Sequence, residues 1–432
     1  MVAVDAGASR AKPDSDRRTL VLGRSVSAFL FAGALVAYAA LVVGYVVLTP
    51  PWQNPDEPAH FNYVKFVATT GGLPVLQPGD WDSDLLNRLK NGILQPSDDI
   101  GAIRYESWQP PLFYLVAAPV YRLGPADAAL YRVRVLDAVF GALTLALGYA
   151  AARKVFAGVL QAAVPLAMVG VPMFTAVAAS FGADALANLL AAAIVLLLLR
   201  QLRGEPRPLL SGALIGLGVL TKLELAIFVP LAIGLVTLRS ARPRRDALVL
   251  VATVGVLISP WLIHQVTSYG WADPLAIARH SQVVADQPRF PGLSAEWLGQ
   301  FATISFHSFW AQFGWMAVVA PDRLYVIWGA VTIAAVVGLL VSRAWMREHA
   351  YQFLLVTVAI AFVAYVGYNL AFVQFQSRYL FTALVPIAIL VVRGWSAFPP
   401  RPWSALVLAA ALVMLNAYAL LRILVPGFTP IT

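Results

Sequence analysis

The apolar run VSAFLFAGALVAYAALVVGYVVL at residues 26–48 decides the fold class. Its 23 residues carry no charge and exceed the roughly 18 residues that a helix needs to cross a bilayer. Similar runs at 160–179 and 403–421 indicate a chain that crosses the membrane several times. Only 12% of the residues are charged, about half of the roughly 25% typical of soluble proteins. The sequence therefore predicts an all-α polytopic membrane protein and argues against a soluble enzyme.

Hydropathy predicts about eleven transmembrane helices, with a range of 10 to 13. The expected spans are 26–48, 131–152, 159–180, 184–200, 208–222, 223–238, 247–266, 324–342, 350–370, 379–393 and 403–425. We expect them to form one transmembrane domain over residues 25–426, preceded by a basic tail at 1–24. The run at 26–48 is too long for the core of a cleavable signal, so it predicts an anchor.

Basic residues predict the orientation. With the N-terminus in the cytoplasm, 18 of the 31 Lys and Arg residues fall in short cytoplasmic segments, as the positive-inside rule requires. The net charge of +9 therefore reflects insertion in the plasma (inner) membrane, and no nucleic acid is expected as a partner. The chain has no cysteine, so it can form no disulfide and no thiolate metal site.

Two predicted outer loops, 49–130 and 267–323, are much longer than any cytoplasmic connection. Both are rich in aromatic residues, which argues against disorder, and long ordered loops are usually functional. We expect the chemistry to lie in the first of them, on the outer side of the membrane. Its apolar stretch 111–123 is too short to span and is expected to lie at the outer surface.

The sequence PPWQNPDEPAHFNY at 50–63 follows the first span directly. Pro58 suits the first turn of a helix, with Asp56 or Glu57 at its N-cap. The positive end of the helix dipole favours the ionised carboxylate and lowers its pKa. Such a carboxylate can act as a general base toward a hydroxyl or hold a cation; the alternative is a plain helix cap.

Four further stretches carry polar residues at predicted membrane edges. They are YESWQPPLFY at 105–114, DALAN at 184–188, TKLE at 221–224 and VQFQSRYLF at 373–381. Asp184 and Asn188 share a helix face; the alternative for Asp184 is a plain N-terminal cap. Lys222 and Glu224 lie at the apex of two predicted short spans, and short spans often surround a buried functional site. The alternative is that the two side chains form an ion pair that reaches toward the membrane surface. The fork of Arg378 suits a phosphate, but arginine also anchors helices at lipid headgroups.

In this order, DEPAH at 56–60, QPPLFY at 109–114, Asp184 to Asn188, LTK at 220–222 and SRYL at 377–380 resemble the C-type (GT-C) membrane glycosyltransferases. That superfamily includes the dolichyl-phosphate-mannose protein mannosyltransferases and the aminoarabinose transferases. SFWAQFGW at 308–315 resembles a largely uncharacterised bacterial subgroup. The resemblance covers about residues 30–395.

The resemblance implies an inverting transferase that moves a sugar from a polyprenyl-phosphate carrier to a glycan, lipid or protein acceptor outside the membrane. Asp56 then matches the catalytic base, with Glu57 beside it, and Arg378 matches the residue that meets the carrier phosphate. Lys222 and Asp184 match motifs that line the same cavity. The remaining residues that we predict to bind substrate are His60, Tyr63, Arg104, Gln109, Asn188 and Tyr379.

A divalent cation, Mg²⁺ or Mn²⁺, is left open as a cofactor, with Asp56, Glu57 and Asp184 as its possible ligands; no spacing demands it. Two other function classes remain. One is a transporter or flippase of lipid-linked sugars, which predicts an inverted repeat and a site near the membrane midplane. The other is a membrane partner in envelope assembly without catalysis of its own.

Overall fold

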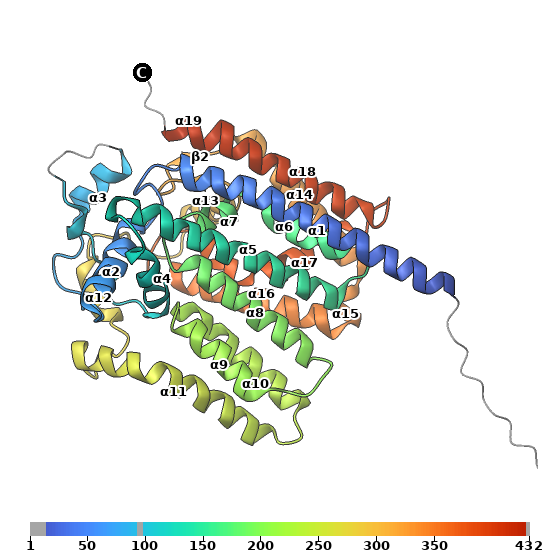
Figure 1. The fold of residues 1–432 in the computed structure, drawn as a ribbon, viewed down its shortest axis with the longest axis horizontal. Helices are drawn as coiled ribbons and strands as arrows, with labels where there is room; N and C mark the ends of the chain where they lie inside the picture. Colours follow the sequence, from blue (N-terminus) through green and yellow to red (C-terminus); the bar gives the residue numbers. More distant parts are fainter. Residues whose placement is uncertain (1–13, 93–97, 429–432) are drawn as a thin grey trace, which may run out of the picture.

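The computed structural model describes residues 14–92 and 98–428, with side chains from residue 25 onward. Residues 1–13 of the predicted tail lie outside the described residues, as do the side chains of 14–24. Long helices run side by side and form one bundle (Figure 1). They are α1 (Asp14–Leu48), α5 (Ala129–Val155), α8 (Asp184–Gln201), α11 (Pro243–Tyr269), α14 (Asp322–Ser342), α16 (His349–Asn369), α17 (Leu384–Trp395) and α18 (Trp403–Ala419). The predicted all-α membrane fold is confirmed.

Within the described residues, eight helices are long and apolar enough to span a membrane, or nine if one bent pair counts as a span. This pair, α6 (Leu160–Val169) and α7 (Pro172–Ala178), replaces the straight span expected at 159–180 and bends by 70°. Val171 is extended because Pro172 follows it, which ends the first helix.

The two predicted spans at 208–222 and 223–238 form helices that are too short to cross a membrane on their own. They are α9 (Pro208–Val219), η3 (Leu223–Ile227) and α10 (Phe228–Arg239). Twelve helical residues rise about 18 Å, against a hydrocarbon core of about 30 Å. The expected count of eleven spans is therefore not reached by length and composition, although helices form at all eleven positions.

The two long loops fold into short elements rather than extended chain. The first contains α2 (Glu57–Thr70), α3 (Ser83–Lys90), η1 (Ile100–Ala102), α4 (Leu112–Arg122) and η2 (Ala126–Ala128). The second contains α12 (Ile277–Val283), α13 (Ala295–Trp310) and the two-stranded antiparallel sheet of β1 (Gln312–Phe313) and β2 (Val318–Val319). Four of these helices, α2, α3, α4 and α12, gather at the left-hand end of the bundle in Figure 1. A small apolar core that joins residues of α2, α3 and the second loop ties the loops together.

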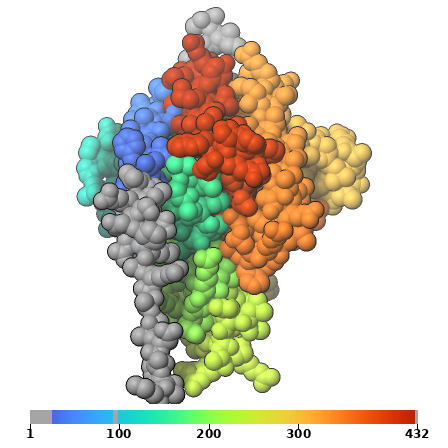
Figure 2. Space-filling model, turned by 90° about the vertical axis from the view of Figure 1, so that its right-hand side faces the viewer, coloured from blue at the N-terminus to red at the C-terminus, as the bar shows by residue number. Residues whose placement is uncertain are grey.

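The remaining elements are short. They are α15 (Ala344–Arg347), η4 (Ser377–Ala383), η5 (Leu420–Leu424) and α19 (Val425–Phe428). Seen from the right-hand side of Figure 1, segments from distant parts of the sequence pack closely against one another (Figure 2). Helices α14 and α17 approach most closely at Gly338 and Gly394, where a Cβ on Gly394 would lie 1.9 Å from the carbonyl oxygen of Ala335. Small residues of this kind allow two helix backbones to touch.

Candidate active site

Asp56 stands at the entry to α2 with a backbone that turns its side chain away from the helix. Its φ of 65° is in the left-handed region, which Asp tolerates better than most residues. Its carboxylate makes no capping hydrogen bond to α2, so the interpretation as a plain cap is wrong. One carboxylate oxygen instead accepts a 2.6 Å hydrogen bond from the Tyr105 hydroxyl, and the other pairs with the Arg378 guanidinium.

Glu57 points in another direction, into the protein. Its carboxylate pairs with Arg134 of α5 at 2.6 Å, and both side chains are fully buried. Glu57 also accepts hydrogen bonds from the amides of Trp52 and Phe181 and from the side chain of Asn54. The structure thus separates the two adjacent carboxylates that the sequence placed at one catalytic centre. Glu57 fixes the loop to the bundle, and Asp56 is left facing the cavity described below.

Charged side chains from four separate segments form a continuous network around Asp56. Arg378, in η4, also donates to Asp184 at 3.3 Å. Lys222, just before η3, lies 2.5 Å from the other oxygen of Asp184 and 3.8 Å from Glu224. The two cations therefore lie among three carboxylates that come from α8, η3 and the start of α2.

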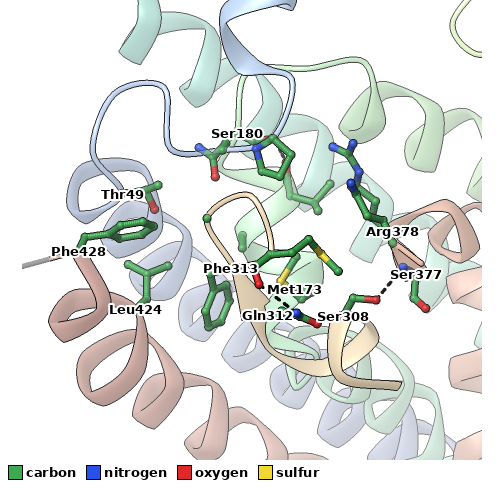
Figure 3. A pocket seen from close by; sticks show the side chains of 17 residues that line it. Thr49, Met173, Ser180, Ser308, Gln312, Phe313, Ser377, Arg378, Leu424 and Phe428 are labelled. Carbon is green, nitrogen blue, oxygen red and sulfur yellow. Dashed lines mark hydrogen bonds between the residues drawn. The ribbon is translucent and has the colours of Figure 1, made fainter. Parts of the chain in front are cut away.

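Arg378 is held in place by the residue before it. The Ser377 amide donates to Ser308 Oγ at 2.9 Å, and the Ser377 hydroxyl donates to the carbonyl of Ser305 at 2.7 Å. Both partners belong to α13, so the second long loop positions the arginine. On this side Arg378 borders a narrow cavity with mostly apolar walls, where the Ser308–Ser377 contact is visible (Figure 3).

On its other side the network borders a cavity of about 460 Å³, which we call the central cavity. The residues that line it and were predicted from the sequence are Asp56, His60, Gln109, Asp184, Lys222, Arg378 and Tyr379. Aromatic residues, among them Tyr105, Tyr368 and Phe372, form much of the remaining wall. A cavity with apolar walls and a few convergent polar groups is the usual form of a ligand site.

Burial and charge set the ionisation of the loop residues in the central cavity. Burial raises the pKa of Asp56. The charges of Arg378 and His60, together with the hydrogen bond from Tyr105, outweigh this effect and hold the pKa at about 2. Burial, reinforced by the charge of Asp56, raises the pKa of Glu106 to about 8. Burial lowers the pKa of His60 to about 4, against the opposing effect of Asp56 and Asp184. At neutral pH, Asp56 is therefore ionised, whereas Glu106 and His60 are uncharged.

Four of the predicted site residues do not line the central cavity. Besides Glu57, they are Tyr63, Arg104 and Asn188. Tyr63 stacks on Tyr114 with ring centroids 3.5 Å apart and supports the wall from behind, because Tyr114 in turn contacts His60. Arg104 pairs with Asp80 at 2.8 Å at the edge of a different pocket.

The sequence did not single out several residues that do line the central cavity. Tyr105 and Glu106 belong to the stretch at 105–114 from which only Gln109 was selected, and a carboxylate between aromatic residues was an available signal. His280 and Tyr368 lie in segments without a distinguishing pattern.

The carboxylates do not form the divalent cation site that the sequence left open. Glu57 is turned away to Arg134, and the Arg378 guanidinium bridges Asp56 and Asp184. Among the described residues, no three His, Asp or Glu side chains are grouped as metal ligands. The donor set of these described residues therefore does not fit Mg²⁺ or Mn²⁺, which prefer several oxygen ligands.

Residues 87–391, well over half of the chain, match the family described as predicted membrane protein (DUF2142). The chain belongs to this family. No curated protein matches its sequence.

Solved structures with a similar fold come from the GT-C glycosyltransferases. ArnT from Cupriavidus metallidurans bound to undecaprenyl phosphate matches with a TM-score of 0.57 and 17% identity, over 88% of this chain and 63% of ArnT. Its apo state matches with a TM-score of 0.55. The apo oligosaccharyltransferase of Archaeoglobus fulgidus matches at 0.48, with 11% identity over 92% of this chain and 55% of that one. This DUF2142 protein thus spans less than two thirds of these proteins and has the GT-C fold that its sequence predicts.

Proposed function

We propose that this DUF2142 protein is an inverting glycosyltransferase that moves a sugar from a polyprenyl-phosphate carrier to an acceptor hydroxyl. One observation carries the proposal: Asp56, Lys222 and Arg378, from segments far apart in the sequence, converge on one cavity beside the long loops. An ionised carboxylate beside two cations is what transfer from a lipid phosphate requires, because the leaving group already carries negative charge.

In the proposed reaction, Asp56 accepts the proton of the acceptor hydroxyl as its oxygen attacks the anomeric carbon. The bond between that carbon and the phosphate oxygen breaks, and its electron pair stays on the phosphate. Arg378 and Lys222 stabilise the charge of the departing lipid phosphate. Attack from the side opposite the phosphate inverts the anomeric centre.

The pairing of Asp56 with Arg378 makes the base weak before the donor binds, since it holds the pKa near 2. A donor phosphate competes for the same guanidinium. As Arg378 turns toward the phosphate, Asp56 loses its strongest partner and its pKa rises toward the ordinary value. Asp56 would therefore become a stronger base only once the donor phosphate has bound.

The fold supports a lipid-phosphate donor, because ArnT, which shares it, is described bound to undecaprenyl phosphate. We place the reaction on the extracytoplasmic side of the plasma membrane, with the N-terminus in the cytoplasm and a role in cell-envelope glycan, glycolipid or glycoprotein synthesis. The transporter alternative predicts charged residues at the membrane midplane. The site charges instead line a cavity whose walls include residues of both long loops, which favours the enzyme.

The test uses the purified full chain in nanodiscs, labelled polyprenyl-phosphate sugars and membrane extract as the source of acceptors. We expect Asp56→Asn to lower transfer by about 10²- to 10⁴-fold, the usual contribution of a general base. Arg378→Ala should weaken binding of undecaprenyl phosphate, whereas Lys65→Ala, which removes an exposed cation that lines another pocket, should change neither quantity. Full transfer by Asp56→Asn, or unchanged lipid-phosphate binding by Arg378→Ala, would contradict the assigned roles.

A further inference from the structure

A second cavity meets Asp56 from the side of the loops. It measures about 320 Å³, and we call it the loop chamber. It shares Asp56, Tyr105, Gln287 and Gln374 with the central cavity. Asp56 therefore stands at the boundary of two spaces: one holds the cations Lys222 and Arg378, and the other is built by the long loops. A base in this position can take a proton from a group in the loop chamber while the leaving group lies in the central cavity.

The walls of the loop chamber are rich in side chains that both donate and accept hydrogen bonds. Four amide side chains line it: Asn87, Gln287, Gln374 and Gln376. A carboxamide offers one acceptor and two donors, which matches the hydroxyl groups of a polyol, each a donor and an acceptor. Two indole rings, Trp81 and Trp315, add flat apolar surface against which the C–H face of a sugar ring can pack.

Charges in the loop chamber favour a neutral ligand. Besides Asp56, the described residues that line the chamber include one cation, Lys90, and one further anion, Asp286. Lys90 Nζ also lies 5.1 Å from the ring centroid of Trp315, where a cation–π contact occupies its charge. A phosphate or a sulfate would need an excess of positive charge, and the described residues of this chamber carry no such excess. An aliphatic lipid would need apolar walls, and polar residues outnumber aliphatic ones here.

Two polar atoms of the chamber residues have no hydrogen-bond partner in the described part of the chain. The indole N–H of Trp81 and the side-chain carbonyl of Gln287 are both buried and unpaired. An unsatisfied buried donor or acceptor costs about 1–3 kcal/mol, so such groups usually serve a ligand or a bound water. One is a donor and the other an acceptor, and both side chains belong to the wall of the loop chamber.

We infer that the loop chamber binds a saccharide and that the acceptor is the hydroxyl of a glycan, presented to Asp56 from the side opposite the lipid phosphate. The inference rests on the proposed function for the role of Asp56, but the binding of a sugar in the loop chamber can be measured without donor. Trp81 and Asn87 act as specificity residues for the acceptor and take no part in the bond that breaks.

Binding is tested by saturation-transfer difference NMR on the full chain in nanodiscs, without donor. The probes are methyl glycosides of glucose, galactose, mannose, N-acetylglucosamine and arabinose, with a serine-containing peptide and glycerol for comparison. We expect at least one glycoside to bind, and Trp81→Ala and Asn87→Ala each to weaken its binding at least tenfold. Asn87 is exposed, so its variant keeps the test valid if the loss of Trp81 disturbs folding. Lys65→Ala, which changes an exposed side chain that lines a different pocket, is the control.

Transfer assays then separate the two proposals. With a working donor, Asn87→Ala should raise the KM for the acceptor at least tenfold while donor binding stays unchanged. Label on peptide or lipid would overturn the saccharide inference and leave the glycosyltransferase standing. Saccharide binding without transfer from any lipid-phosphate donor would leave the chamber assigned and refute the proposed function. If no glycoside binds, or if neither Trp81→Ala nor Asn87→Ala changes the affinity for the glycoside, the saccharide inference is wrong.

Discussion

Replacing Glu57 by Gln should destabilise the protein, whereas replacing its neighbour Asp56 by Asn should inactivate it. Glu57 and Arg134 form an ion pair without exposed surface. The guanidinium also donates to three backbone carbonyls, those of Val46, Thr49 and Pro50, and so fastens the end of α1 to α5.

The magnitude follows from what Glu57→Gln leaves behind. The substitution keeps the shape but removes the negative charge, and it places an NH2 group with two N–H donors among groups that donate to Glu57. Breaking one side of a buried ion pair costs about 3–5 kcal/mol. With an unfolding entropy of about 2.1 cal/mol/K per residue, a chain of 432 residues should lose roughly 3–6 °C in Tm.

The assay is thermal unfolding in matched nanodiscs, followed by tryptophan fluorescence, with transfer measured well below the transition. At that temperature, Glu57→Gln should keep most of its transfer activity. Asp56→Asn should lose transfer, and its Tm should fall by less than the Tm of Glu57→Gln. In the double variant Glu57→Gln/Arg134→Met, the loss should be smaller than the sum of the single losses, because no unpaired charge stays buried. Wild-type Tm together with lost transfer in Glu57→Gln would refute the structural role and restore Glu57 to the catalytic centre.

Three further results are expected. Lys222→Met should weaken donor binding roughly 10- to 150-fold, the equivalent of about 1.5–3 kcal/mol for a hydrogen bond to a charged group, and Lys222→Arg should recover part of it; unchanged lipid-phosphate affinity would exclude this contact. The folded protein keeps the Glu106 proton up to about pH 8, whereas the unfolded chain releases it near 4.5, so the free energy of unfolding should fall as pH rises between these values. Urea unfolding across this range should show a shallower fall in Glu106→Gln, and an identical slope would contradict the raised pKa. Gly394→Val should lower Tm because its side chain would meet the backbone of α14, whereas Gly367→Ala, with open space around its Cα, serves as the control; equal Tm values for the two variants would refute the close contact.

The sequence predicts the fold class and the helix positions because hydropathy is a local property. Every expected span coincides with helix, since an uncharged apolar run has to satisfy its backbone hydrogen bonds within itself in a membrane. The number of full-length spans was harder to predict, because Pro172 bends one segment sharply and the helices near Lys222 stop short.

The site residues were predicted from short sequence motifs, and seven of them line the central cavity in the structure. Two of the predicted residues that lie outside this cavity are held there by partners from other segments. Asp56 and Glu57 are adjacent and chemically alike, and only the left-handed backbone at Asp56 and the position of Arg134 on another helix decide which one faces the cavity. Likewise, Arg104 pairs with Asp80, a partner that no local pattern indicates.

The sequence alone thus determined that this protein is a membrane helix bundle, where its long loops fall and which charged residues stand out among apolar ones. The tertiary structure decided which charges meet. Asp56, Asp184 and Arg378 are separated by more than a hundred residues along the chain, and their contact depends on the packing of α8 against η4 and on the fold of the first loop. The loop chamber is likewise a product of packing, because the side chains that line it come from both long loops and from the segment before η4. Local pattern specifies helices, but a site built from distant segments exists only once the helices and loops have packed together.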